Sequence, residues 1–172
     1  MIVDNSSTDG ASDLSEAYIP FIKSASDRRY VRSREDWYVR WDSETVSFYK
    51  ADKKARFQNY EYYFKTGIGI PMVKSSRIKA FLMQNRVFDQ SIVGIFPKDK
   101  TNLNYILALM SSDIINQIIH IINPTANNSA NYIKLIPYIE PSSMLLDEIS
   151  ETVDRIVELS ENIDAVSYTH LR

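Results

Sequence analysis

Residues 56–68, Arg-Phe-Gln-Asn-Tyr-Glu-Tyr-Tyr-Phe-Lys-Thr-Gly-Ile, combine cations, amides and aromatic rings in consecutive positions. Cations neutralise phosphates, and amides such as Gln58 and Asn59 form paired hydrogen bonds with an adenine edge. Aromatic rings stack on bases. The same two amides could instead close a turn. These residue types, close together, indicate a surface that contacts nucleic acid.

Further basic residues lie on both sides of this segment. Residues 23–86 contain 15 Lys and Arg against 7 Asp and Glu, whereas residues 140–164 contain 8 acidic residues and one Arg. A basic half of this kind attracts polyanions although the whole chain has a net charge of −2, but a charge run can also be a solvated surface. The candidate DNA-binding residues are Arg28, Arg29, Arg32, Arg34, Arg40, Lys53, Lys54, Arg56, Gln58, Asn59, Lys74, Ser76, Arg77 and Lys79.

Catalytic and metal-binding motifs are not evident. The sequence contains no cysteine and no glycine-rich phosphate loop, and His120 stands alone in an isoleucine-rich stretch. Asp52-Lys53-Lys54 matches the Asp-x-Lys ending of some nuclease metal sites, but three residues are a weak match. Asn123-Pro124-Thr125 lacks the second proline and the aromatic residue of an amino-methyltransferase catalytic loop. We therefore predict no catalytic or metal-binding residue.

The pattern of apolar and aromatic residues predicts an α+β fold. We expect a small antiparallel or mixed sheet, a buried helix and a C-terminal heptad-patterned helix. Aromatic and β-branched runs predict strands at 37–41, 46–49, 60–65, 79–87, 90–96 and 132–138. Apolar residues at helical spacing predict one buried helix over residues 103–122. A second helix should begin at Ser142 or Ser143. Gly67 and Gly69, followed by Pro71, are expected to break regular structure.

The composition divides the chain into four parts. Residues 1–17 are predicted to be a flexible leader, residues 18–141 a recognition domain and residues 142–165 the last helix. Residues 166–172 resemble translated sequencing-adaptor sequence and are expected to be a non-native tail. The chain begins without the basic flank and apolar core of a signal peptide, and its longest apolar run, residues 114–122, is too short to cross a bilayer. We expect a cytoplasmic protein that does not contact membranes.

Several blocks, in order, resemble the C-terminal target recognition region of bacterial N6-adenine DNA methyltransferases. Such enzymes occur in type II restriction–modification and in BREX-type phage defence. The resemblance covers about residues 22–164, and it departs from the family at Gly69-Ile70, at Ser75-Ser76-Arg77 and at Ala130-Asn131-Tyr132. The matching blocks are Arg56-Phe57-Gln58-Asn59, Tyr62-Tyr63-Phe64-Lys65, Gly67-Ile68, Phe88, Ile95-Phe96-Pro97, residues 105–112, Asn123-Pro124-Thr125 and Ile133-Lys134-Leu135-Ile136-Pro137.

The resemblance implies a fragment that recognises a specific duplex DNA sequence for a larger enzyme. The upstream catalytic domain of that parent would bind S-adenosylmethionine and methylate the adenine, and no cofactor is expected in this chain. The expected partners are double-stranded DNA and the upstream domain. Two alternatives stay open: a protein–protein interaction module without DNA contact, and a small metal-dependent nuclease.

Overall fold

The computed structural model describes residues 2–4, 18–23, 28–32, 37–73 and 75–169. The strands are β1 (Ile2–Asp4), β2 (Tyr18–Ile22), β3 (Trp37–Arg40), β4 (Gly67–Pro71), β5 (Phe81–Met83), β6 (Val87–Phe88) and β7 (Ile92–Ile95). The α-helices are α2 (Ser43–Ala51), α3 (Leu103–Ser111), α4 (Asp113–Ile122), α5 (Ala130–Ile133) and α6 (Ser143–Thr169). Short 3₁₀ helices are η1 (Lys53–Ala55), η2 (Tyr60–Tyr62) and η3 (Lys100–Asn102).

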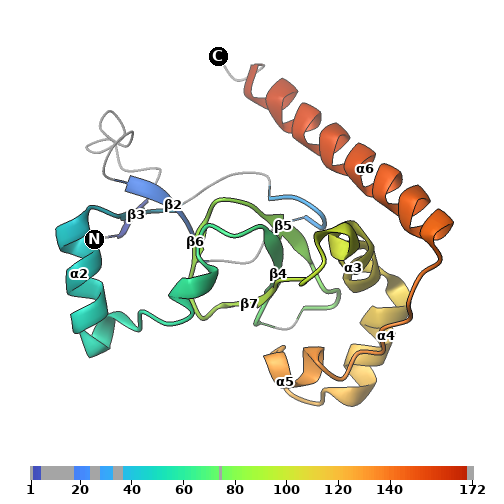
Figure 1. Ribbon diagram of the computed structural model, residues 1–172, viewed down its shortest axis with the longest axis horizontal. Coiled ribbons are helices and arrows are strands. Elements are labelled where there is room, and N and C mark those ends of the chain that lie inside the picture. The colour runs from blue at the N-terminus through green and yellow to red at the C-terminus, as the bar shows by residue number, and fades with distance from the viewer. Residues whose placement is uncertain (1, 5–17, 24–27, 33–36, 74, 170–172) are drawn as a thin grey trace.

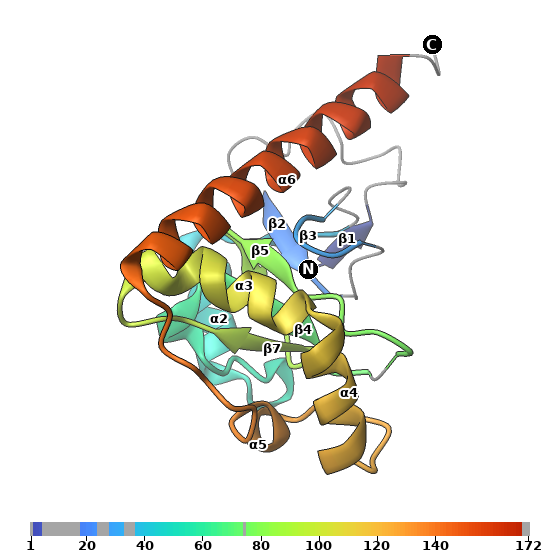
Figure 2. The same cartoon turned by 90° about the vertical axis from the view of Figure 1, so that its right-hand side faces the viewer.

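Two small sheets form the centre of the molecule (Figure 1). The first has the order β1-β3-β2-β6, in which β3 is antiparallel to both neighbours and β2 runs parallel to β6. The second is antiparallel, with β4 between β5 and β7. Helices α3, α4 and α5 lie beside the second sheet, and α2 lies at the far end of the molecule (Figures 1 and 2). The α+β fold predicted from the sequence is confirmed.

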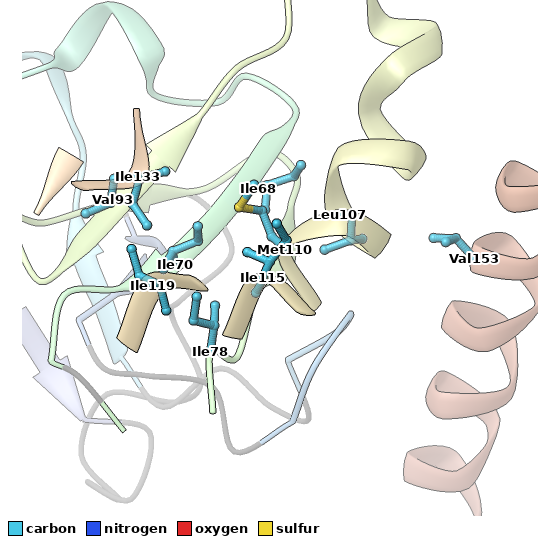
Figure 3. Packing of buried hydrophobic residues seen from close by; sticks show 11 residues of the cluster. Ile68, Ile70, Ile78, Val93, Leu107, Met110, Ile115, Ile119, Ile133 and Val153 are labelled. Carbon is cyan, nitrogen blue, oxygen red and sulfur yellow. The ribbon is translucent and has the colours of Figure 1, made fainter. Parts of the chain in front are cut away.

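Strand β4 has the sequence Gly-Ile-Gly-Ile-Pro, so its two faces carry different residues. Ile68 and Ile70 are fully buried and pack in the main core with residues of α3 and α4 (Figure 3). On the glycine face, a Cβ placed on Gly67 would lie 2.5 Å from the Phe96 ring, and one on Gly69 would lie 2.6 Å from the Phe81 ring. The prediction that these glycines break regular structure was wrong, because their missing side chains make room for aromatic rings.

The predicted helix over residues 103–122 is two helices, since the chain turns by 68° between them. Ser112 lies at the corner in an extended conformation, and its hydroxyl accepts a hydrogen bond from the Ile115 backbone N–H at 3.2 Å. Asp113 follows in the first turn of α4, where a negative charge suits the helix dipole. A serine N-cap therefore ends one helix and begins the next, which lets both apolar faces cover the isoleucine face of β4.

The last helix begins at Ser143, as predicted, and continues to Thr169, which includes part of the expected tail. Val153 is 2% exposed and packs in the main core, with Ile149 and Val157 half-buried against it. Asn104 of α3 donates a hydrogen bond to the Asp154 carboxylate at 2.8 Å. Figures 1 and 2 show α6 beside α3 at its start and extending beyond the domain at its C-terminal end.

Three of the predicted strands are wrong. Residues 46–49 belong to α2, because the Asp42 side chain accepts the Thr45 backbone N–H at 2.9 Å and caps a helix rather than closing a hairpin. Residues 60–62 form η2, and Ala130–Ile133 forms α5. Aromatic residues favour strands only where a sheet surface receives them, and here tertiary packing overrides that preference. The predictions at 37–41 and 90–96 are confirmed by β3 and β7, and β5 lies within 79–87.

The predicted leader is structured at its beginning, because residues 2–4 form β1 and pair with β3. Residues 5–17 lie outside the described part of the chain. No single helix among the described residues is long and apolar enough to cross a bilayer. Helices α3 and α4 reach that length only as a bent pair; most of their apolar residues pack in the core, whereas Ile114 and Ile121 are exposed.

Candidate nucleic-acid interface

The segment 56–65, which we call the amide loop, has an unusual backbone. Three of its residues, none of them glycine, adopt left-handed φ values: Arg56 at 48°, Asn59 at 57° and Phe64 at 64°. Such conformations cost energy for residues with side chains and persist only where surrounding contacts hold them. The Tyr63 hydroxyl donates to the Gln58 carbonyl at 3.1 Å, and the Phe64 N–H donates to the Arg86 carbonyl at 2.9 Å. The loop is therefore held in one shape.

Two aromatic side chains anchor the amide loop. The Phe57 ring lies 5.9 Å from the Trp41 ring and 6.2 Å from the Tyr49 ring, measured between centroids. The Tyr63 ring lies edge-on to Trp41 at 5.8 Å and to Phe88 at 5.3 Å. Between the anchors, residues 58–62 are exposed. Gln58 and Asn59 are thus presented to solvent on a loop fixed at both ends, which lowers the entropy cost of binding.

Burial of Tyr63 also changes the pKa of its phenol. Desolvation raises the pKa of the Tyr63 phenol to about 12, and the nearby charges of Asp89 and Glu61 act in the same direction. The phenol therefore stays protonated throughout the neutral range. It can keep donating its hydrogen bond to the loop.

A third support comes from Phe96, which follows β7. Its ring lies where Cβ atoms of Gly67 and Gly94 would be, at 2.5 and 2.6 Å. It stacks on Tyr62 of the amide loop with centroids 4.8 Å apart and an interplanar angle of 26°. The ammonium of Lys65 lies 5.3 Å from the Tyr62 centroid. Bare backbone in the sheet therefore supports Phe96, and Phe96 supports the loop.

A hollow of about 540 Å³ opens between the amide loop and β7. Three amides and three aromatic rings contribute to its wall, together with aliphatic residues and the backbone of Gly94. The amide and aromatic residues are Gln58, Asn59, Gln90, Tyr62, Phe88 and Phe96. Gln90 was not predicted as a site residue, since it lies in the turn between β6 and β7 and no local pattern connects it with the loop.

Exposed cations lie next to the amide loop. Lys53 and Lys54 are exposed on η1, and Arg56 is exposed at its end. The ammonium of Lys50 lies 5.8 Å from the Tyr60 ring centroid. From residue 50 to residue 65 the chain carries five cations and two acidic residues. The structure thus brings Lys53, Lys54 and Arg56 close to the predicted amides.

Arg40 has a different role at this end of the molecule. Its guanidinium pairs with Asp42, the residue that caps α2. The pKa of the Asp42 carboxyl lies well below its usual value, first because the Thr45 backbone and hydroxyl donate to it, and then because Arg40 lies beside it. Arg40 therefore supports the N-terminus of α2.

The weak nuclease match is explained by local structure. The Asp52 carboxylate accepts the backbone N–H of Lys54 at 2.9 Å and caps η1. Among the described residues no cluster of three or more His, Asp or Glu could hold a metal ion. His120 is exposed, and its Nδ1 lies 2.7 Å from the Asn116 carbonyl, so that nitrogen carries the proton.

Arg28, Arg29 and Arg32 precede or follow Tyr30, whose backbone bonds to the β5 segment, and they lie away from the amide loop. Arg29 donates to the Ser111 carbonyl at 2.8 Å, at the corner between α3 and α4. The guanidinium of Arg32 lies 5.2 Å from the Phe81 ring centroid, and Arg28 is partly buried. Arg29 and Arg32 thus stabilise the fold through contacts of their own. Arg34 lies outside the described residues.

Ser76, Arg77 and Lys79 lie in the connection between β4 and β5. Arg77 forms an exposed ion pair with Asp113 at 3.1 Å, and Asn116 donates to the Ser76 carbonyl at 3.1 Å. Lys79 is partly buried. This group meets Arg29 at the α3–α4 corner rather than joining the amide loop. Lys74 lies outside the part of the chain that is described.

The opposite end of the molecule is acidic. Helix α6 carries seven acidic residues and one arginine, and Figure 1 shows it far from α2. The basic and acidic parts noted in the sequence therefore remain apart in space. Comparison with protein-family models and with curated proteins finds no match to this chain.

Proposed function

We propose that this chain recognises a specific sequence of duplex DNA as the target recognition domain of a bacterial N6-adenine DNA methyltransferase. Such a parent would serve restriction–modification or phage defence. The amide loop carries the proposal: exposed Gln58 and Asn59 are held in a fixed geometry beside the exposed cations Lys53, Lys54 and Arg56. Cations position a protein on the phosphates, and amides distinguish adenine from other bases.

The distribution of charge supports an orientation on DNA. Phosphates attract the end that carries α2 and the amide loop and repel α6. Helix α6 would therefore point away from the duplex, toward the rest of the parent enzyme. S-adenosylmethionine and the methyl transfer belong to the parent's catalytic domain, into which the target adenine would be turned out of the stack.

Fluorescence anisotropy of the full chain with labelled duplex DNA tests the proposal. The test variant replaces Lys53, Lys54 and Arg56 with Ala. The matched control replaces Lys98, Lys100 and Lys134, three exposed cations on other segments, and removes the same charge. Each phosphate contact contributes about −0.9 to the slope of log affinity against log salt.

We expect the test variant to bind more weakly and with a shallower salt slope, while the control retains the wild-type slope. Equal losses in both variants would mean that charge alone, and not this surface, attracts DNA. No binding by folded wild-type protein would contradict the proposal.

One observation favours a protein partner as the second candidate. Leu159 and Ile163 of α6 are 53% and 58% exposed, and acidic residues flank them. A module that only binds proteins would use this helix and would show little salt dependence with DNA. The Lys53/Lys54/Arg56 variant would then behave as wild type in every assay.

A further inference from the structure

We propose that the hollow between the amide loop and β7 holds a single nucleobase that has left the DNA stack. This inference rests on the proposed function and specifies a ligand for one part of the surface. It assigns a binding role to Gln90, Tyr62 and Phe96, which the recognition of groove edges does not require. Three observations lead to it: the amides, the rings and the uncharged lining.

The amides of the hollow come from two separate segments. Gln58 and Asn59 belong to the amide loop, and Gln90 belongs to the β6–β7 turn. Each amide offers both a donor and an acceptor, which matches the alternating donors and acceptors on the edge of any base. Within the described part of the chain, no side-chain hydrogen bond engages Gln58, Asn59 or Gln90, and all three are exposed.

The rings offer a surface on which a flat base can stack. Tyr62 and Phe96 lie stacked at 4.8 Å, and Phe88 is nearly parallel to Phe96 at 6.0 Å. Tyr62 is 38% exposed, so part of this ring system is open to a ligand. Base–aromatic stacking is a general means of holding unpaired bases. The Lys65 ammonium, 5.3 Å from the Tyr62 centroid, offers a cation beside the ring for the attached phosphate chain.

The lining also excludes other classes of ligand. None of the described residues that line it is charged, so this part of the wall does not favour a free phosphate or a carboxylate. Its remaining wall is aliphatic and includes Met72, Ile92 and Val93. Gly94 of β7, an edge strand in the described sheet, also contributes to the wall. Amides, rings and an apolar wall together suit a neutral, flat, hydrogen-bonding molecule.

Three labelled duplexes that differ at one central position test the inference with the full chain. The first duplex has a matched pair at this position. The second has an unpaired base opposite an abasic site, and it is made once with thymine and once with adenine as that base. The third has abasic sites in both strands. A base without a partner leaves the stack at little cost. We expect the second duplex to bind on the order of tenfold more tightly than the first. The third should lose that gain.

Two variants locate the effect. Gln90→Ala removes an exposed amide outside the amide loop, and Gln117→Ala removes an exposed amide on α4 as its control. The first should reduce the preference for the unpaired base over the matched pair, whereas the control should retain that preference. Tyr62→Ala should abolish the preference, and circular dichroism must show that the variant is folded.

The outcomes separate the two proposals. Salt-dependent binding of all three duplexes with equal affinity would overturn the inference and leave the proposed function intact. A preference that survives Gln90→Ala and Tyr62→Ala would place the base elsewhere and would also overturn it. Failure to bind any duplex would overturn both.

Discussion

The two faces of strand β4 carry different residues and have different structural roles. On one face, Ile68 and Ile70 fill the space between the sheet and helices α3 and α4. On the other, Gly67 and Gly69 leave the backbone bare, so that Phe96 and Phe81 lie directly on it. The isoleucine face gains stability from buried aliphatic volume. The glycine face gives up that volume and gains a close fit, which holds the amide loop through Phe96 and Tyr62.

The comparison predicts that stability and DNA binding can be separated by face. Substitutions on the isoleucine face should lower the free energy of unfolding and leave the affinity of folded protein unchanged. Substitutions on the glycine face should affect both.

Ile68→Ala should destabilise the protein most, by about 2–5 kcal/mol, because it leaves a cavity at a fully buried position. Urea denaturation followed by circular dichroism measures the change. The same sample, at a temperature where it is folded, should bind duplex DNA as the wild type does. Loss of affinity in folded Ile68→Ala would show that the two faces are not independent.

Gly67→Ala should destabilise by about 1–3 kcal/mol, since the added Cβ would lie 2.5 Å from the Phe96 ring and 2.8 Å from the Ile95 carbonyl. It should also weaken DNA binding, because Phe96 supports the amide loop. Gly94→Ala is the matched comparison, as the three atoms nearest to its added Cβ are side-chain atoms of Phe96 and Met83. Gly94→Ala is expected to lower the free energy of unfolding by less than Gly67→Ala does. A larger decrease for Gly94→Ala would contradict the role given to the backbone at Gly67.

Tyr63→Phe should cost about 0.5–1.5 kcal/mol near neutral pH, because the hydrogen bond to the Gln58 carbonyl is lost. Since the folded-state pKa of Tyr63 is raised to about 12 from an unfolded value near 10, folding favours the protonated phenol. The wild type therefore loses stability as pH rises from about 10 toward 12, and the Phe variant lacks this loss. Unfolding curves at pH 7 and at several values above 9 should show the difference between the two proteins shrinking.

Asn59→Gly should change stability by only a few tenths of a kcal/mol, since glycine adopts the left-handed conformation without strain. DNA affinity should still fall, because the amide is lost while the loop keeps its shape. Asn59→Ala is the companion variant and should be the less stable of the two. Unchanged DNA affinity in Asn59→Gly would show that the Asn59 amide does not contribute to DNA binding.

The sequence predicted those elements whose signals are local. The aromatic run at residues 37–41, the apolar run at 90–96 and the heptad pattern after Ser142 each mark an element by themselves. The corner between α3 and α4 also had a signal, the Ser112-Asp113 pair within an apolar run, and a capping argument applied there would have divided the helix.

Other features depended on tertiary contacts. From sequence alone, a glycine predicts an interruption of regular structure. At Gly67 the glycine instead makes room for the Phe96 ring, and this contact could not be predicted because Phe96 is far from Gly67 in sequence. Gln90 joins Gln58 only because β6 and β7 return to the loop. Among the predicted basic residues, composition did not distinguish Lys53, which is exposed, from Arg29, which is bonded to the α3–α4 corner.

The parallel pairing of β2 with β6 has a consequence for how the chain folds. Phe21 pairs with Val87, so this contact closes a long stretch of chain that contains α2 and the amide loop. Contacts between residues far apart in sequence form slowly, because closing the chain between them loses conformational entropy before the stabilising contacts are made. The antiparallel pair β4 and β5 is closer in sequence and can form earlier. When the full chain refolds, the pairing of β2 with β6 is therefore expected to follow the pairing of β4 with β5.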